Sequence, residues 1–196
     1  MNNNQRFHRT YIALRGISIA ILSVVLISFI ATAWAGKLMD KVPSTEALNF
    51  TLMSAQGSDI SLTDYEGKFV LLNFWATWCP PCVREMPALN VLHNKLKSNR
   101  NFVVVGVHVG PALATVKQFL KDKPVDFDIV IDKNMSLSSW PVSGLPTTFL
   151  ISPTGKIIYK ATGEREWGSD EMVKFIQGVI KEYERLAESD AEVSSG

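Results

Sequence analysis

The sequence has few of the residues that most often bind metal ions, with only two cysteines and three histidines in 196 residues. A structural zinc site needs about four such ligands, and no second cysteine pair is present to complete one. We therefore expect no metal centre. The chain also lacks an excess of charge of either sign, since its net charge is +1 at pH 7. Without a broad basic surface it is not predicted to bind nucleic acid.

Charge is missing altogether from one segment, residues 16–36. As a helix, this segment could cross about 30 Å of hydrocarbon. Residues 1–15 before it contain three arginines and no acidic residue, a bias that keeps the N-terminus in the cytoplasm. Two interpretations stay open: a single-pass membrane anchor, which the length of the apolar run favours, or a signal peptide cleaved near Ala35. Both place the remainder of the chain in the periplasm or outside the cell.

Composition divides that remainder into three parts. Residues 37–48 are interpreted as a linker, because Pro43 interrupts any periodicity. Residues 49–186 hold the strong strand and helix patterns and form the predicted folded domain. Residues 187–196 are acidic and rich in serine, so we expect a flexible tail.

The predicted domain alternates strands with helices. Its elements are a hairpin of strands at 49–53 and 59–62, strands at 69–75, 102–109, 127–131, 147–151 and 156–160, and helices at 81–97, 112–123 and from Ser169 to Leu186. Such alternation predicts an α/β fold, namely a three-layer α/β/α sandwich around a central mixed sheet. The hairpin would extend this sandwich at its N-terminal side, and the hydrophobic helix would precede it.

The two cysteines, Cys79 and Cys82, are separated by two residues and follow the predicted buried strand 69–75 directly. A pair at this spacing suits thiol-disulfide exchange, in which one thiolate attacks a foreign disulfide and the other resolves the mixed disulfide. The first turn of the following helix favours a thiolate at Cys79, because its N–H groups are unpaired and the helix dipole is positive there. We therefore predict that Cys79 attacks and Cys82 resolves.

Pro80 and Pro81 separate the cysteines and carry no N–H that could stabilise the thiolate. The pKa of Cys79 should fall only moderately, which favours a reductant over a strong oxidant. No cofactor is expected besides the redox-active disulfide itself. A purely structural disulfide is the competing interpretation, but so short a loop restricts the unfolded chain little.

Two motifs carry a family resemblance. The stretch from Phe74 to Cys82, followed by Glu85 and Pro87, and the stretch from Gly144 to Ile151 resemble the thioredoxin-like TlpA/ResA group of exported disulfide reductases. The resemblance covers residues 49–186. It implies a thioredoxin-like sheet of about four or five strands and delivery of electrons from a membrane reductase of the DsbD/CcdA kind.

The resemblance also implies roles for individual residues. Pro146 would follow a cis peptide bond and face the cysteines, and the backbone of Leu145 would offer an edge to an extended client segment. Trp78 is expected to contact the client beside the two prolines of the motif. Thioredoxin has a buried aspartate where this chain has Asn73, so that proton acceptor is missing. Glu85 is the remaining nearby carboxylate, and its role stays open between proton transfer and a plain acidic residue near a helix start.

Two functional classes follow from these features. The first is an extracytoplasmic reductase of disulfides in exported clients, of the cytochrome c or oxidase maturation type. The second is a non-catalytic thioredoxin-fold module that holds a partner while its cysteines stay in an idle disulfide. A peroxiredoxin is disfavoured, because its peroxidatic cysteine follows a threonine by three residues, whereas Cys79 follows Thr77 by two.

Overall fold

The computed structural model of the chain describes residues 38–99 and 101–194, with the backbone alone for 190–194. The predicted basic segment 1–15 and hydrophobic segment 16–36 lie outside the described residues. In the described ranges, no helix combines the length and the apolar composition needed to cross a membrane.

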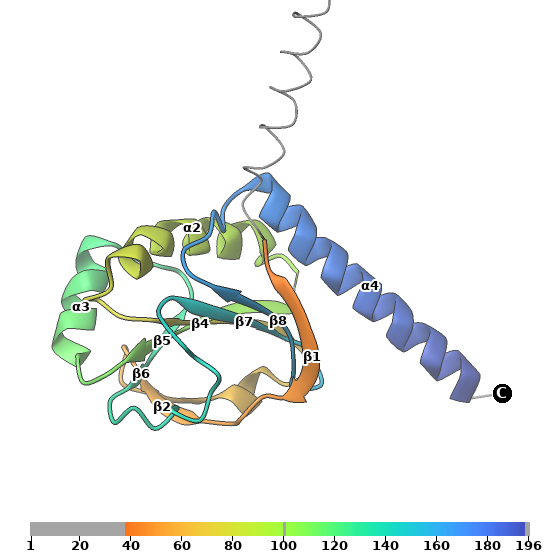
Figure 1. The fold of residues 1–196 in the computed structure, drawn as a ribbon, viewed down its shortest axis with the longest axis horizontal. Coiled ribbons are helices and arrows are strands. Elements are labelled where there is room, and N and C mark those ends of the chain that lie inside the picture. The colour runs from red at the N-terminus through yellow and green to blue at the C-terminus, as the bar shows by residue number, and fades with distance from the viewer. Residues whose placement is uncertain (1–37, 100, 195–196) are drawn as a thin grey trace, which may run out of the picture. The chain divides into compact units, whose positions relative to one another are not determined.

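A mixed sheet of eight strands forms the centre of the fold, in the order β1-β8-β7-β4-β5-β6-β2-β3 (Figure 1). The strands are β1 (Asp40–Glu46), β2 (Thr51–Ser54), β3 (Asp59–Ser61), β4 (Phe69–Trp75), β5 (Phe102–Val109), β6 (Asp128–Asp132), β7 (Thr147–Ile151) and β8 (Lys156–Thr162). β4, β5 and β6 run parallel, and β7 runs antiparallel to β4. The sheet exceeds the four or five strands that the resemblance implied, because β1 extends one edge and the β2–β3 hairpin the other.

Three α-helices and one 3-10 helix accompany the sheet, namely α2 (Pro80–Leu96), α3 (Leu113–Asp122), α4 (Asp170–Ser194) and η1 (Leu62–Tyr65). Leu89 of α2, Val116 of α3 and Ile176 of α4 all belong to one hydrophobic core, on one face of the sheet. Among the described residues, the core on the opposite face contains no side chain from an α-helix. The prediction of helices on both faces is therefore wrong.

The connections between the parallel strands explain this arrangement. The chain steps from β4 through α2 to β5 and then through α3 to β6, moving in the same direction across the sheet. Because such crossovers are right-handed, both helices come to lie on the same face. In Figure 1, α2 lies above the strands and α3 lies at their left-hand end. The other face is covered by η1 and by the segment 133–146 between β6 and β7.

The predicted linker 37–48 contains strand β1, which pairs with β8 at the edge of the sheet. Six of its seven residues are exposed, so the sequence shows no alternation of buried and exposed positions. Pro43 is accommodated because the pairing register shifts between Lys41 and Thr45, a place where a missing N–H is tolerated. The folded unit begins at Leu38 and not near residue 49.

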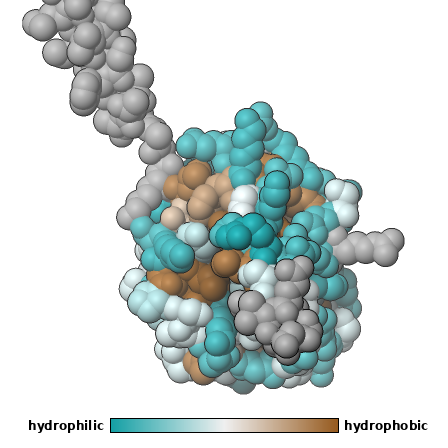
Figure 2. All heavy atoms as spheres, turned by 90° about the vertical axis from the view of Figure 1, so that its right-hand side faces the viewer, coloured by the Kyte–Doolittle hydropathy of each residue, from teal (hydrophilic) through white to brown (hydrophobic). Residues whose placement is uncertain are grey.

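The C-terminal helix begins as predicted and ends later than predicted. The N–H of Met172 donates a hydrogen bond to Oγ of Ser169 at 3.2 Å, which confirms the N-cap. α4 continues to Ser194, so the segment 187–194 is helical where a flexible tail was expected. A groove lies between α4 and β8, and Figure 2 shows this side of the molecule with apolar patches interrupted by hydrophilic side chains.

Candidate active site

The two cysteines lie where β4 gives way to α2, with Cys79 as the N-cap residue and Cys82 in the first turn of the helix. They form a disulfide, and their Cα atoms are 5.3 Å apart. The N–H of Cys82 donates a hydrogen bond to Sγ of Cys79 at 3.4 Å. Cys79 is 5% exposed and Cys82 is 0% exposed. Cys79 is therefore the more accessible sulfur, and the helix N-terminus stabilises negative charge on it.

Pro80 and Pro81 occupy the first two positions of α2. Pro80 is exposed and Pro81 is half-buried. Neither has an N–H to donate, so the N–H of Cys82 is the helix donor that reaches the sulfur of Cys79. Trp78, which precedes the pair, is 68% exposed and stands beside the more accessible cysteine in the chain.

A cis peptide bond joins Leu145 and Pro146 directly before β7, as the resemblance implied. The carbonyl of Pro146 accepts a hydrogen bond from the N–H of Gly163 at 2.8 Å, which ties the end of this loop to the segment after β8. In the described part of the chain, the backbone N–H and carbonyl of Leu145 make no hydrogen bond. Both groups are therefore available to another extended chain.

His108 holds the loop that leads to the cysteines. It is fully buried on β5, opposite Trp75 of β4, and its ring lies edge-on to that indole at 5.1 Å. Nε2 accepts the backbone N–H of Thr77 at 3.1 Å, so this nitrogen carries no proton. Burial lowers the pKa of His108 below its usual 6.5, which keeps the imidazole neutral and able to accept.

Glu85 is a buried carboxylate on α2, one turn after Cys82 and 2% exposed. Its Oε1 accepts a hydrogen bond from Nδ2 of Asn73 at 2.9 Å. Its Oε2 accepts one from Nε1 of Trp167 at 2.9 Å and one from the backbone N–H of Arg165 at 3.2 Å. The carboxylate thus has three donors from two separate parts of the chain, β4 and the segment before α4, and is buried and hydrogen-bonded instead of lying free at the helix surface.

The burial of Glu85 changes its titration. Loss of solvent raises the pKa of Glu85 to about 7, although the hydrogen bonds from Trp167, Asn73 and Arg165 act in the opposite direction. A carboxyl group with a pKa near neutrality exchanges protons readily at the pH at which thiols react. Because positions three apart share a helix face, Glu85 and Cys82 are neighbours under the start of α2.

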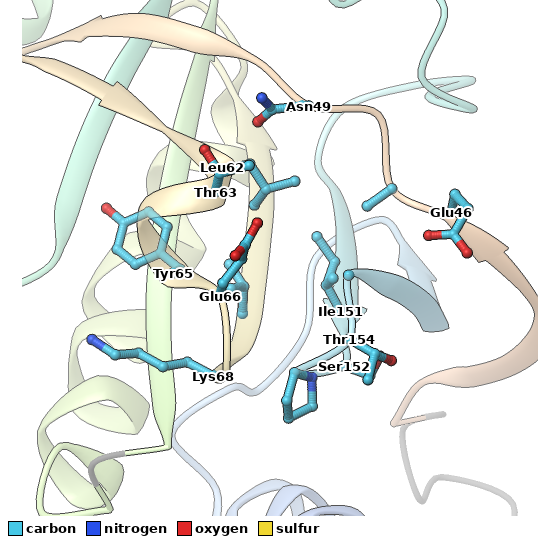
Figure 3. Close-up of a pocket in the computed structure, with 14 residues that line it drawn as sticks. Glu46, Asn49, Leu62, Thr63, Tyr65, Glu66, Lys68, Ile151, Ser152 and Thr154 are labelled. Atoms are coloured by element: carbon cyan, nitrogen blue, oxygen red, sulfur yellow. The ribbon is translucent and has the colours of Figure 1, made fainter.

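The remaining surface holds a hollow that is unrelated to the cysteines. It lies between η1 and the β7–β8 turn, with Tyr65 and Glu66 on one side and Ser152 and Thr154 on the other (Figure 3). This hollow lies at the start of β4, roughly 20 Å along the strand from the disulfide. In the described ranges, no cluster of three or more His, Cys, Asp or Glu side chains could hold a metal ion.

Comparison with known proteins agrees with this geometry. Residues 43–160 match the model of the AhpC/TSA family. The ResA thiol-disulfide oxidoreductase of Bacillus subtilis is 38% identical over 149 residues, which cover 76% of this chain and 82% of the relative. The ResA protein of Halalkalibacterium halodurans is 34% identical over 165 residues, covering 83% and 91%. The chain belongs to the family of the ResA thiol-disulfide oxidoreductases.

Solved structures of other proteins support the fold of this member of the ResA family. A putative thiol:disulfide interchange protein DsbE from Chlorobium tepidum matches with a TM-score of 0.63 and 30% identity, covering 71% of this chain and 97% of that one. A DsbF homologue from Corynebacterium diphtheriae has the same fold, with a TM-score of 0.63 and 23% identity. The fold is therefore thioredoxin-like, and the protein is a thiol:disulfide oxidoreductase.

Sequence reasoning found the cysteines of this oxidoreductase but not the partners of Glu85. Trp167 is fully buried, and its indole N–H donates a hydrogen bond to the carboxylate. Asn73 takes a place in the same network, since it donates to Oγ1 of Thr148 at 2.9 Å as well as to Glu85. Trp167 is 82 positions from Glu85, so no local pattern could have joined the two.

Proposed function

We propose that this oxidoreductase reduces disulfides in exported client proteins, with its folded domain held outside the cytoplasm by the hydrophobic segment 16–36. The observation that carries the reductase assignment is the unequal placement of the two sulfurs. Cys79 is at the helix N-terminus and 5% exposed, and Cys82 is fully buried one turn before the three-donor carboxylate of Glu85. One cysteine is placed to meet a client and the other to finish the exchange.

The reaction begins with the reduced protein. The thiolate of Cys79 attacks one sulfur of a client disulfide, so a bond forms between protein and client while the client disulfide breaks and its second sulfur leaves as a thiolate. Cys82 then loses its proton and attacks the sulfur of Cys79. The mixed disulfide breaks, the client leaves with two reduced sulfurs, and the protein keeps the disulfide between Cys79 and Cys82. Two electrons have passed to the client.

Glu85 serves the second step in this proposal. A resolving thiol must give up its proton before it attacks, and a buried carboxylate with a pKa of about 7 can accept it. Asn73 supports this role by donating to Glu85 rather than by accepting the proton itself. The carboxylate of Glu85 thus stands in the functional place of the aspartate that thioredoxin has at the position of Asn73.

The client approaches across Trp78 and the two prolines of the motif. Its extended segment pairs with the free backbone groups of Leu145, next to the cis proline at 146. After each turnover the disulfide must be reduced again, and outside the cytoplasm this needs a membrane electron donor of the DsbD/CcdA kind. A cysteine pair of an apocytochrome c or of an oxidase assembly factor would be a suitable client.

A trapping experiment tests the proposal. The full-length Cys82→Ser variant, expressed in its own cell, should accumulate mixed disulfides through Cys79, because the resolving sulfur is gone. The matched Cys79→Ser variant should accumulate few. Mass spectrometry of the trapped species identifies the clients. Equal trapping by both variants would contradict the assignment of the attacking sulfur.

Turnover separates the proposal from the binding-module alternative. The full-length chain should catalyse the reduction of insulin with dithiothreitol as the electron donor. A well-folded sample that shows no turnover would favour a non-catalytic module with an idle disulfide.

A further inference from the structure

The groove between α4 and the β1–β8 edge of the sheet has a volume of about 480 Å³ and is lined mainly by apolar side chains. Tyr159 of β8 and Phe175 of α4 meet edge-on in its wall, with ring centroids 5.3 Å apart. Leu186 also lines it and is 47% exposed. We call this surface the α4 groove, and its other lining residues include Lys41, Gly178 and Val179. No residue of the redox site lines the α4 groove, so that site does not account for it.

Gly178 in this groove is not required by the fold of a single chain. It lies exposed in the interior of α4 and has no positive φ, so its backbone conformation suits any residue. A Cβ atom at position 178 would have no atom of the surrounding structure within 4 Å. Glycine nevertheless weakens a helix relative to alanine. A glycine without a use inside the chain allows the backbone of another molecule to approach α4 closely.

The C-terminal part of α4 buries no side chain among the residues whose side chains the structure describes. Tyr183 is the last residue of α4 that packs against the hydrophobic core, and every side chain from 184 to 189 is exposed. The helix continues to Ser194, and Figure 1 shows this end extending away from the sheet. Tertiary packing supplies most of the stability of helices in proteins. This end of α4 would therefore gain stability from a second surface that covers it.

The charges on α4 are arranged symmetrically about Gly178. Lys174 and Glu182 lie four residues before and after it, Glu171 and Arg185 lie seven residues before and after it, and all four are exposed. Within one helix, Lys174 and Glu182 are about 12 Å apart along the axis, too far to form an ion pair. In two antiparallel α4 helices related by a two-fold axis at Gly178, Lys174 comes level with Glu182 of the second copy, and Glu171 with Arg185. The axis repeats each contact, so the interface contains two sets of both opposite-charge pairs.

We propose that the α4 groove binds a second copy of the chain, with the two α4 helices antiparallel and crossing at Gly178. The missing side chain lets the two helices approach more closely than the usual axial distance of about 8–10 Å. Phe175, Val179 and Leu186 supply apolar contacts beside the crossing, and the charge pairs fix the register. The same surface is used by both copies, so the dimer is closed. This inference goes beyond the proposed reductase function and does not depend on it.

Two other occupants fit the α4 groove less well. A strand added to the edge of β1 is disfavoured, because Pro43 and the register shift between Lys41 and Thr45 interrupt that edge. A bilayer surface with anionic lipids would be repelled by Glu171 and Glu182. A second α4 places an opposite charge against each of these glutamates.

Sedimentation of the full-length chain in detergent micelles, over a range of protein concentrations, tests the dimer. Wild type should dimerise reversibly. Gly178→Lys should raise the dissociation constant about tenfold or more, because two large side chains of like charge would meet at the two-fold axis. The same change removes a glycine from a helix interior, so the melting temperature of the dilute chain should rise by about 2–4 °C. Weaker association together with a more stable fold excludes misfolding as the cause. Gln118→Lys, at an exposed position on α3, is the matched control and should leave the dissociation constant unchanged.

Charge reversal tests the register of the two helices. Lys174→Glu and Glu182→Lys should each raise the dissociation constant about tenfold, because each turns two attractive pairs into two repulsive ones. The double variant should return close to the wild-type value, since opposite charges again come level. Because the two positions are too far apart to pair within one helix, such a rescue can arise only between copies.

Four results overturn the proposal. The first is a chain that stays monomeric at every concentration. The second is a dimer that Gly178→Lys does not weaken, which assigns association to another part of the chain. The third is a double variant as dissociated as the single variants. The fourth is a monomer in nanodiscs of anionic lipid whose α4 is protected from hydrogen exchange by the lipid, which assigns the α4 groove to the bilayer.

Discussion

The two faces of strand β4 differ in polarity. Asn73 points to the face covered by the helices, where it joins a buried polar network with Glu85 and Trp167. Phe74, the next residue, points to the opposite face and packs against Trp140. One face holds a titrating group away from solvent, and the other packs apolar side chains together. A single strand thus separates a buried polar network from apolar packing, because successive side chains of a strand point to opposite faces.

The largest effect on stability is expected from the apolar face. Trp140 is buried and contacts Phe74 and Phe149, with ring centroids 5.4 and 5.5 Å away. Trp140→Ala should lower the free energy of unfolding by about 3–5 kcal/mol through the lost burial and the cavity that remains. Because this face contributes apolar packing, the loss should be similar at pH 5 and pH 8. Urea unfolding at pH 5 and pH 8 measures this loss in the free energy of unfolding. A loss that depends strongly on pH would contradict the view that this face contributes apolar packing alone.

The polar face should respond to pH instead. Burial raises the pKa of Glu85 to about 7 from its usual 4.5, so the folded chain binds this proton more tightly than the unfolded chain does. The stabilisation by this proton is complete at a pH below the pKa of Glu85 in the unfolded chain. It is lost as the pH rises through the pKa of Glu85 in the folded chain. Relative to Glu85→Gln, the wild-type protein should lose about 2–3 kcal/mol between pH 5 and pH 8.

Urea unfolding of the oxidised forms of both proteins checks this prediction, because the disulfide then contributes equally. The glutamine variant keeps the shape: its oxygen can accept from Trp167 and Arg165, and its NH2 group can donate to Asn73 once that amide turns its unpaired oxygen toward it. It therefore isolates the titration. Parallel pH profiles for the two proteins would mean that Glu85 does not titrate in this range. The same variant should slow resolution by Cys82, seen as a longer-lived mixed disulfide, without slowing the first attack.

The smallest effect concerns His108, which lies beside Trp75 on the helix-covered face and binds the cysteine loop through Thr77. Burial lowers the pKa of His108, so its stabilisation is present above the unfolded pKa of about 6.5 and is lost as the pH falls. His108→Asn can offer an oxygen to the Thr77 N–H without titrating, whereas His108→Leu leaves that N–H unpaired at a cost of about 1–2 kcal/mol. Thermal unfolding of the leucine variant should show a loss even at pH 8.

The asparagine variant is the control for that measurement. It should lose less stability than wild type on going from pH 7 to pH 5, since nothing at position 108 gains a proton. If the wild-type and asparagine proteins respond alike to acid, His108 does not titrate in the folded chain.

The central part of the fold could be predicted from the sequence because its signals are local. The bounds of β4, β5 and β7 match the apolar runs that predicted them, since strands buried on both faces are apolar throughout. The family motif from Gly144 to Ile151 implied the cis peptide bond before Pro146, and the structure has this bond. These features depend on residues that stand next to one another in the chain.

The features that were missed depend on distant parts of the chain. β1 is a strand only because β8 offers it an edge, and its own residues carry no alternating pattern. The placement of all three helices on one face follows from the order of the strands, which no single helix reveals. Likewise, the three donors to Glu85 come from β4 and from the segment before α4, so its burial could not be seen from its helix position.

The loop between β6 and β7 is fixed at one end by Asp132 and at the other by the β7 strand that follows the cis proline. Leu137, Trp140 and Val142 of this loop pack on the face of the sheet without α-helices, yet none of them belongs to the hydrogen-bond network around Glu85. Apart from the buried Trp140 and the cis peptide before Pro146, changes in this loop should therefore leave the network around Glu85 intact. For protein engineering, the exposed positions of this loop can be exchanged between relatives, and the buried carboxylate of Glu85 should keep its three donors.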